Sequence, residues 1–424
     1  MKGVELMKLF NVFVFILLLF FSSSALAVSL GEMQEMALGN RQVVQQYVTS
    51  LEKSVEDISL ARAPYYPSVD VGYIVNSLDE ASSVEEQENS TIQGRVSFNL
   101  FAGFRDKYNV ESAQLLKVVQ EYSLQGIRQD LQLSVALAYL SVYERLANKK
   151  VALSAFETLG KVYSDGDSRF KVGLIGKNEL LKFRVDYDNA DITLKAAEAG
   201  LKKSINVLSR QVGSRIAFAD LDYAEFKELP PLMDKKAYTQ AMLETRSEIK
   251  ALETLVGVSD AQVKSKKSGY YPKVDFVGSY TFYDDDYISG SGQYDDDELR
   301  AQLVLSMNLF SGFATDSNVT KAKLSARSGR YELTELKDSF SNDLDNLFID
   351  FEVSLDNVNV ATRSIEQAEE NLRITQLKYD EGLQRESDLL DAITSLSRAQ
   401  YNYVTVLRTA FSNNFQIIRM VDGF

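Results

Sequence analysis

One unit occurs twice along the chain, and this internal repeat constrains the fold more than any other feature. The stretch TIQGRVSFNLFAGF at 91–104 matches RAQLVLSMNLFSGF at 300–313. The asparagines of the two NLF triplets, Asn99 and Asn308, lie 308 − 99 = 209 residues apart. A repeat of this length indicates two copies of one structural unit rather than two unrelated domains.

Two further pairs of segments fall in the same order in each half. YYPSVDVGY at 65–73 matches YYPKVDFVGSY at 270–280, and FKVGLIGKNELLKF at 170–183 matches YDEGLQRESDLLDA at 379–392. Each half therefore carries the order helix, strand hairpin, long helix, glycine turn, helix. We predict a mixed α and β fold made of two repeats.

The predicted hairpins alternate apolar and polar residues with the period of a β-strand. Each run is about 9–11 residues long, which is enough to cross a bilayer when tilted. From alternation alone, a soluble hairpin with one face on a core is an equal alternative. The apolar positions are Val69, Val71, Tyr73 and Val75, then Ile92, Val96, Phe98 and Leu100, and in the second half Ala301, Leu303, Leu305, Met307 and Leu309.

A long amphipathic helix follows each hairpin. The first runs from Phe104 to about Tyr163 without a proline, and apolar residues recur in it every three or four positions. A helix of that length extends about 90 Å, so it must lie beside other helices in an elongated bundle. The second half repeats this apolar stripe 209 residues later. The stripe of the first helix is Leu124, Ile127, Leu131, Val135, Ala138, Val142 and Leu146, and that of the second is Leu333, Leu336, Phe340, Leu344, Leu347, Phe351 and Leu355.

Four strands cannot close a barrel, and an open sheet edge is forbidden in lipid because its backbone groups would stay unpaired. Symmetric self-association resolves this, because three copies supply twelve strands, an even number within the bacterial range. We therefore expect a homotrimer.

The N-terminus has the pattern of a secretory signal peptide at 1–27. Lys2 and Lys8 precede an apolar core of about 13 residues, and SSSALA ends with an A-x-A site that predicts cleavage after Ala27. No later stretch reaches 18 consecutive apolar residues, so we expect strands and not helices to span the membrane. No cysteine follows the cleavage point, which argues against a lipoprotein anchor.

Composition argues against most enzymes and against nucleic-acid binding. The chain has no histidine and no cysteine, so thiolate nucleophiles, Ser-His-Asp triads and Cys/His zinc sites are excluded. A carboxylate-using hydrolase remains a minor alternative. The net charge of −14 is unfavourable for contact with phosphates. We predict no enzyme activity, no cofactor, no metal site and no nucleic-acid partner.

The predicted domain organisation has four parts. They are the signal peptide 1–27, a first repeat 28–212 with strand hairpin 65–100 and turn 164–178, an inter-repeat linker 213–235, and a second repeat 236–424 with strand hairpin 270–310 and turn 380–386.

The two NLF-x-GF junctions, the YYP strand entrances and the turns RFKVGL and KYDEGL occur in order, twice, at one spacing. In these features the chain resembles the TolC-like outer-membrane efflux protein family. The resemblance covers essentially the whole mature chain. The resemblance implies a trimeric twelve-stranded β-barrel in the outer membrane of a Gram-negative cell, in contact with its lipid. A long α-helical barrel continues it into the periplasm.

The resemblance also implies a function. Such a channel-tunnel is the passive exit duct of a tripartite efflux pump or a type I secretion system. Its partners are a periplasmic adaptor (membrane fusion) protein and an inner-membrane RND or ABC transporter. The alternative is a structural or adhesive periplasmic coiled-coil protein without a channel. The sequence leaves open whether the cargo is a small molecule or a protein.

By position in the family, the two glycine turns form the periplasmic tip and meet the adaptor. The matching residues are Val172, Gly173 and Leu174 in the first repeat and Gly382 and Leu383 in the second.

Asp388 and Asp391 match the inward-facing acids of the constriction. Their i, i+3 spacing independently places both on one helix face, so three copies would form two rings of three carboxylates. The simpler interpretation is that acids in the first turn stabilise a helix N-terminus, with Ser387 as the cap.

The remaining gate positions depart from the family pattern. Tyr379 matches the gate tyrosine, and Glu179 replaces the aspartate that it would bond. Gln384 stands where an arginine is common, and Arg385 follows it. In the first repeat, Lys182 is the counterpart of Asp391. We therefore expect a closed-state network that differs in detail.

Two acidic loops, at 77–90 and 283–298, are expected to face the outside of the cell. They lack the regular ligand spacing of a Ca²⁺ site. Solvated loops facing lipopolysaccharide are the better interpretation.

Overall fold

The computed structural model describes residues 28–81, 87–217, 221–226, 228–231, 233–284 and 296–424. The predicted signal peptide 1–27 lies outside the described residues, as do parts of both acidic loops. The chain forms two compact units. One contains the described residues up to Val44 with Ile127–Met242 and Ser341–Phe424, and the other contains Gln45–Gly126 and Leu243–Phe340.

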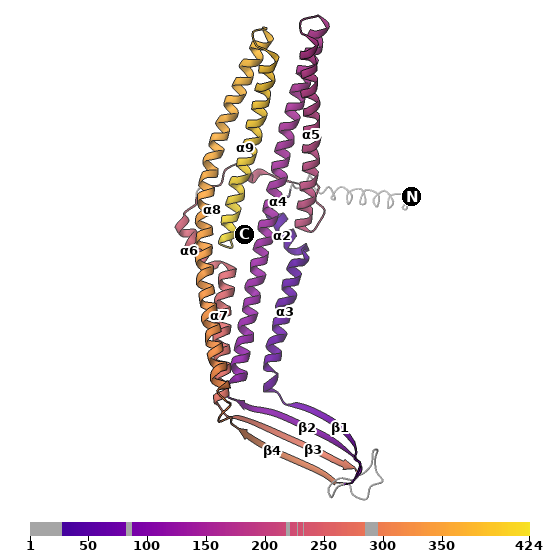
Figure 1. Cartoon of the computed structure of the whole chain (residues 1–424), viewed down its shortest axis with the longest axis vertical. Helices are drawn as coiled ribbons and strands as arrows, with labels where there is room; N and C mark the ends of the chain where they lie inside the picture. The colour runs from indigo at the N-terminus through magenta and orange to yellow at the C-terminus, as the bar shows by residue number, and fades with distance from the viewer. Residues whose placement is uncertain (1–27, 82–86, 218–220, 227, 232, 285–295) are drawn as a thin grey trace, which may run out of the picture. The chain divides into compact units, whose positions relative to one another are not determined.

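Most described residues are helical, and four strands form one sheet (Figure 1). Among the described residues, no helix combines the length and the apolar character needed to cross a membrane. The first half contains α2 (Leu30–Asn40), α3 (Gln42–Arg62), β1 (Ser68–Ser77), β2 (Glu88–Ala102), α4 (Arg105–Lys171) and α5 (Lys177–Val212). The second half contains α6 (Lys235–Thr245), α7 (Ser247–Lys266), β3 (Lys273–Asp284), β4 (Asp296–Ser306), α8 (Ala314–Asp380) and α9 (Glu386–Met420).

The repeat is visible in the helix bounds. α4 and α8 each have 67 residues, and their first residues, Arg105 and Ala314, lie 314 − 105 = 209 positions apart. α5 and α9 begin at Lys177 and Glu386, again 386 − 177 = 209 positions apart. In each half the long helix turns back into the shorter one as an antiparallel hairpin (Figure 1).

α4 continues to Lys171, beyond the end near Tyr163 that the sequence suggested. Gly166 lies inside this last part, where a glycine usually weakens a helix. Here it makes room for a neighbouring ring, because an added Cβ at Gly166 would lie 2.5 Å from the Phe183 ring. Close packing of α5 on α4 therefore outweighs the low helix propensity of glycine.

The NLF-x-GF motif forms the junction between strand and helix. Gly103 and Gly312 both have φ of 62°, and the following Phe104 and Phe313 have φ of 67° and 64°. A left-handed conformation is costly for phenylalanine. A glycine and a phenylalanine in succession, both with positive φ, therefore define a sharp and specific reversal of the chain at each junction. The same geometry at both junctions explains why the motif recurs.

The sheet has the antiparallel order β1-β2-β3-β4, so β1 and β4 are its edge strands. Direct pairing, such as Val69 with Val96 and Phe98 with Phe276, places the apolar positions of all four strands on one face. Its apolar residues and glycines are Val69, Val71, Tyr73, Val75, Ile92, Gly94, Val96, Phe98, Phe101, Val274, Phe276, Gly278, Tyr280, Phe282, Leu299, Ala301, Leu303 and Leu305, and the polar Ser90 and Asp297 lie toward one end of the same face. The opposite face is mainly polar, with Asp70, Gln93, Arg95, Ser97, Asp275, Ser279, Thr281, Arg300 and Gln302, and it also carries four apolar or aromatic residues, Ile74, Val277, Tyr283 and Val304.

Three of the predicted apolar positions differ from this pattern. The β2–β3 register shifts between Asn99 and Phe101, so Leu100 is the extra residue of a β-bulge and Phe101 continues the apolar face. β4 ends at Ser306, and Met307 and Leu309 therefore lie beyond the strand.

The linker between the repeats is anchored to the helices. Leu221 forms a parallel bridge with Val28, and the Tyr139 hydroxyl donates a hydrogen bond to the carbonyl of Asp222. Phe226 is buried, with its ring centroid 5.0 Å from those of Tyr143 and Phe411. The linker thus packs as part of the unit that contains the α4–α5 and α8–α9 hairpin ends.

Candidate functional site at the helical hairpin ends

The two glycine turns have the same hydrogen-bond pattern. Gly173 has φ of 79°, and the Gly173 and Leu174 amides donate to the carbonyls of Phe170 and Arg169 at 2.9 Å each. Gly382 has φ of 73°, and the Gly382 and Leu383 amides donate to Tyr379 and Lys378 at 3.0 and 2.8 Å. Both are Schellman motifs, in which the glycine supplies the left-handed residue that ends the helix.

The turn side chains point away from any core. Val172, Leu174 and Leu383 are 71%, 74% and 78% exposed. An added Cβ at Gly173 or Gly382 would meet no atom within 4 Å. The ends of both hairpins therefore present large apolar side chains on well-defined turns, which is the character of a contact surface for another protein.

The acids behind the turns cap the returning helices. Glu179 accepts a hydrogen bond from the Gly176 amide at 3.3 Å, and Asp388 accepts one from the Arg385 amide at 3.4 Å. Glu179 and Asp388 occupy equivalent positions, 388 − 179 = 209 residues apart. The acidic turn recurs because each helix needs a carboxylate to pair its first amides and to oppose its dipole.

Other predicted residues of the second turn have separate roles. Gln384 donates to the Asp388 carboxylate at 2.8 Å. Arg385 is the N-cap residue of α9, so Ser387, which the sequence suggested as the cap, lies inside the helix. Asp391 is exposed, and no side chain in the described part of the chain pairs with it. Of the two predicted gate acids, Asp391 is the one without a local structural task.

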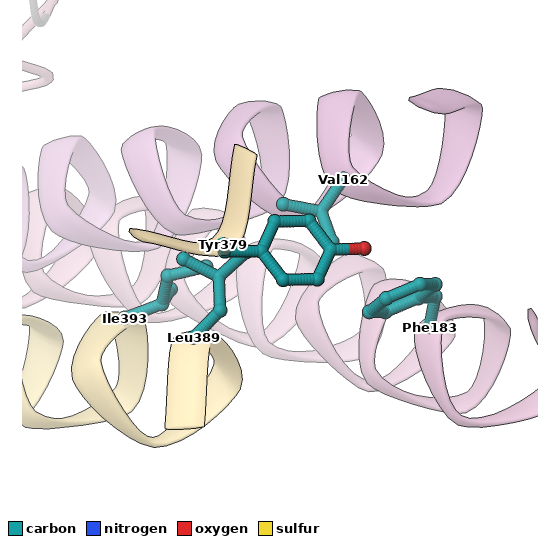
Figure 2. Packing of buried hydrophobic residues seen from close by; sticks show 5 residues of the cluster. All are labelled: Val162, Phe183, Tyr379, Leu389 and Ile393. Carbon is teal, nitrogen blue, oxygen red and sulfur yellow. The ribbon is translucent and has the colours of Figure 1, made fainter. Parts of the chain in front are cut away.

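Tyr379 belongs to a small apolar core that joins all four helices of the two hairpins (Figure 2). It is 9% exposed, and Val162, Phe183, Leu389 and Ile393 complete the cluster. Burial raises the pKa of the Tyr379 phenol, and the neighbouring Arg169 guanidinium partly offsets this rise.

Two cationic contacts hold the hairpins to each other. The Arg169 guanidinium carbon lies 4.7 Å from the centroid of the Tyr379 ring, and Arg169 also pairs with Asp380 at 3.5 Å. Lys182 pairs with Glu386 at 3.1 Å. In both cases a base of the first repeat meets an acid or a ring of the second.

Among the described residues no hydrogen bond joins Tyr379 to Glu179, the residue that replaces the aspartate of the family pattern, and Glu179 caps α5 instead. The contacts of Arg169 and the Lys182–Glu386 pair were not predicted from the sequence. A signal was available, since each pair brings opposite charges to the two turns, but only the packing of the hairpins shows which charges meet.

Within the described residues, no group of three or more acidic side chains could hold a metal ion. Most of the 283–298 loop and residues 82–86 of the 77–90 loop lie outside that part.

Comparisons with known proteins agree with this geometry. Residues 34–214 and 238–420 each match the outer membrane efflux protein family. The outer membrane protein TolC of Escherichia coli (strain K12) is 22% identical over 412 residues, which cover 91% of this chain and 81% of TolC. The outer membrane efflux protein BepC of Brucella suis is 20% identical over 357 residues, covering 82% of this chain and 77% of BepC.

The fold has close counterparts among solved structures. The outer membrane protein VceC from Vibrio cholerae superposes with a TM-score of 0.79 at 17% identity, covering 93% of this chain and 96% of VceC.

Proposed function

Because the chain belongs to the outer membrane efflux protein family and is an efflux channel of the outer membrane, we propose that three copies form the passive exit duct of a tripartite pump or secretion system. In this proposal an inner-membrane RND or ABC transporter supplies the cargo, and a periplasmic adaptor joins it to the duct. The chain itself performs no catalytic step.

The main observation that supports this proposal is the exposed four-stranded sheet. Its apolar face is open to the surroundings, with Val71, Leu299 and Leu305 exposed by 79%, 81% and 70%. Such a face is unfavourable in water and favourable against lipid chains. β1 and β4 each leave one edge unpaired in the described sheet. Pairing β1 of one copy with β4 of the next satisfies both edges, and three copies give twelve strands around a polar interior.

The helices offer a second surface for neighbouring copies. Val353, Val360 and Ile374 of α8 are exposed and lie on one heptad line, with Gln367 at the remaining position. Leu181 and Val185 form an exposed pair on α5. Apolar residues at this spacing are typical of helix faces that pack against another helix. Contact between α8 of one copy and α5 of the next would cover both faces.

We propose that the exposed turn residues Val172, Leu174 and Leu383 receive the adaptor. Gly173 and Gly382 would hold them in place. The contact would be apolar and small, since each turn presents only one or two large side chains.

Next to these turns, the trimer axis would bring three copies of Asp391 together, with Asp388 one helical turn away. Carboxylates at a constriction create a negative potential that concentrates cations. Asp388 would contribute charge while it caps α9, whereas Asp391 would act through its charge alone.

Planar-bilayer recordings of the purified trimer test this function. We expect a cation-selective channel that multivalent cations block from the periplasmic side. Asp391→Asn should weaken both selectivity and block with the trimer intact. The matched control is Asp188→Asn, because Asp188 is an exposed acid of α5 that pairs with Arg184. A trimer that conducts no ions, or Asp391→Asn channels with unchanged block, would contradict the duct and the gate respectively.

A further inference from the structure

A cavity lies where the tip core ends. It has a volume of about 300 Å³ and is walled by α4, α5 and α9. Leu159, Leu390 and Ile393 line it and also pack in or against the Tyr379 cluster, so the cavity continues from a dry core. Its volume is at the lower end for small-molecule sites, which limits a ligand to a compact one.

One ionisable acid faces this apolar space without a partner. Asp186 of α5 lines the cavity and is half-buried, and among the described residues no donor or cation pairs with its carboxylate. The two bases that precede it on the same helix are both engaged elsewhere, Lys182 with Glu386 at 3.1 Å and Arg184 with Asp188 at 2.9 Å. Burial raises the pKa of Asp186. A partly desolvated carboxylate is stabilised when a cation that is itself easily desolvated pairs with it.

The rest of the lining suits the apolar part of a ligand that carries such a cation. Small residues, Ala152, Ala155 and Ala190, leave room between the helices. Tyr401 of α9 also lines the cavity, and burial raises the pKa of its phenol as well. Asn189, Thr193, Thr394 and Ser397 add neutral polar groups to the wall. The cavity therefore combines a largely apolar lining, an aromatic ring and a single unpaired anion, the elements that bind an organic cation.

We propose that this cavity binds compact organic amines, with the ammonium group on the Asp186 carboxylate and an apolar ring between α4, α5 and α9. The site is separate from the glycine turns and from Asp391. The test measures equilibrium binding and not transport. A negative result would therefore contradict the binding site without contradicting the proposed duct.

Equilibrium binding of 1-naphthylmethylamine to the detergent-solubilised protein tests the site, with the neutral 1-naphthalenemethanol as the probe without charge. We expect the amine to bind, and Asp186→Asn to weaken its binding at least tenfold. The alcohol should bind more weakly and should not distinguish the two proteins. Asp188→Asn is the matched control, because Asp188 lies two residues away on the same helix and is already paired. Equal binding of the amine by wild type and Asp186→Asn overturns the proposal, as does no binding.

A labelling experiment locates the amine independently. The chain has no cysteine, so Ser397→Cys places a single thiol on the cavity wall. The amine should slow maleimide labelling of this thiol at least fivefold, and should not do so when Asp186→Asn is also present. Absence of protection overturns the proposal. A thiol that reacts only after the oligomer is dissociated also overturns it, because a second copy of the chain would then occupy the cavity.

Discussion

At the residue scale, the hairpin ends depend on side chains that each serve one physical purpose. The Tyr379 ring fills the small core between the hairpins, and Arg169 lies over its face. Cation–π contacts of this kind contribute about 0.5–2 kcal/mol, depending on how dry they are. The phenol hydroxyl has no hydrogen-bond partner among the described residues, so the ring and not the hydroxyl holds the hairpins together.

This division predicts different outcomes for two substitutions. Tyr379→Phe keeps the ring and should change the local stability of the hairpin ends by less than about 1 kcal/mol. Tyr379→Ala opens a cavity against Phe183 and Leu389 and should cost about 3–5 kcal/mol. Hydrogen exchange of the first turns of α5 and α9 measures both. If Tyr379→Phe raised the exchange rate as much as Tyr379→Ala, a hydroxyl bond would be the main contact.

At the scale of elements, the turns are set by backbone conformation and not by contacts. Gly173 and Gly382 have positive φ with free space around them, so an alanine there meets no clash and loses only conformational energy. Each of Gly173→Ala and Gly382→Ala should therefore destabilise its turn by about 1–2 kcal/mol.

Gly176→Ala is the control, because Gly176 has φ of −81° and also has no atom near an added Cβ. Gly176 is also the N-cap residue of α5, where glycine is preferred to alanine, so a loss of at most about 1 kcal/mol should fall on the start of α5 and not on the ends of α4 and α8. Exchange at the ends of α4 and α8 should rise only in the two turn variants. Equal exchange in all three would mean that the left-handed conformation does not control these turns.

The sequence predicted those elements that local patterns determine. The 209-residue offset, the alternating strands and the glycine turns follow from periodicity and glycine chemistry, and the family, fold class and outer-membrane location are confirmed by the match over both halves. Boundaries were less certain: the β-bulge at Leu100 adds a residue without changing composition, and α4 passes Gly166 because Phe183 packs there.

The candidate site was harder to predict than the fold. The sequence identified Asp388 and Asp391 as a pair, but capping separates them, and this depends on where α9 begins. The contacts of Arg169 and Lys182 join the two repeats across the hairpins. Such pairs depend on three-dimensional packing, about which the spacing of residues within one helix carries no information. The gate and adaptor roles of all these residues stay predictions.

At the scale of the whole molecule, a membrane channel of this fold requires the apolar face of the sheet to meet lipid. Neighbouring residues of β1 distinguish the two faces. Val71 is 79% exposed and pairs with Gly94 on the apolar face, whereas Gly72 pairs with Gln93 on the polar face. An added Cβ at Gly72 meets no atom within 4 Å. A side chain can therefore start from either position without a backbone clash, and the surroundings of the two positions differ.

Arginine at these two positions tests the assignment with the same added charge. In Val71→Arg the guanidinium would face lipid, at a cost of about 2–4 kcal/mol per copy near the bilayer midplane, and a trimer would carry three such costs. In Gly72→Arg it would face the polar interior and stay hydrated. Outer-membrane fractionation with unheated gels should show a strong loss of assembled trimer for Val71→Arg and near-normal assembly for Gly72→Arg. The opposite order would place the polar face toward lipid, and equal assembly of both would mean that neither face is buried in a membrane.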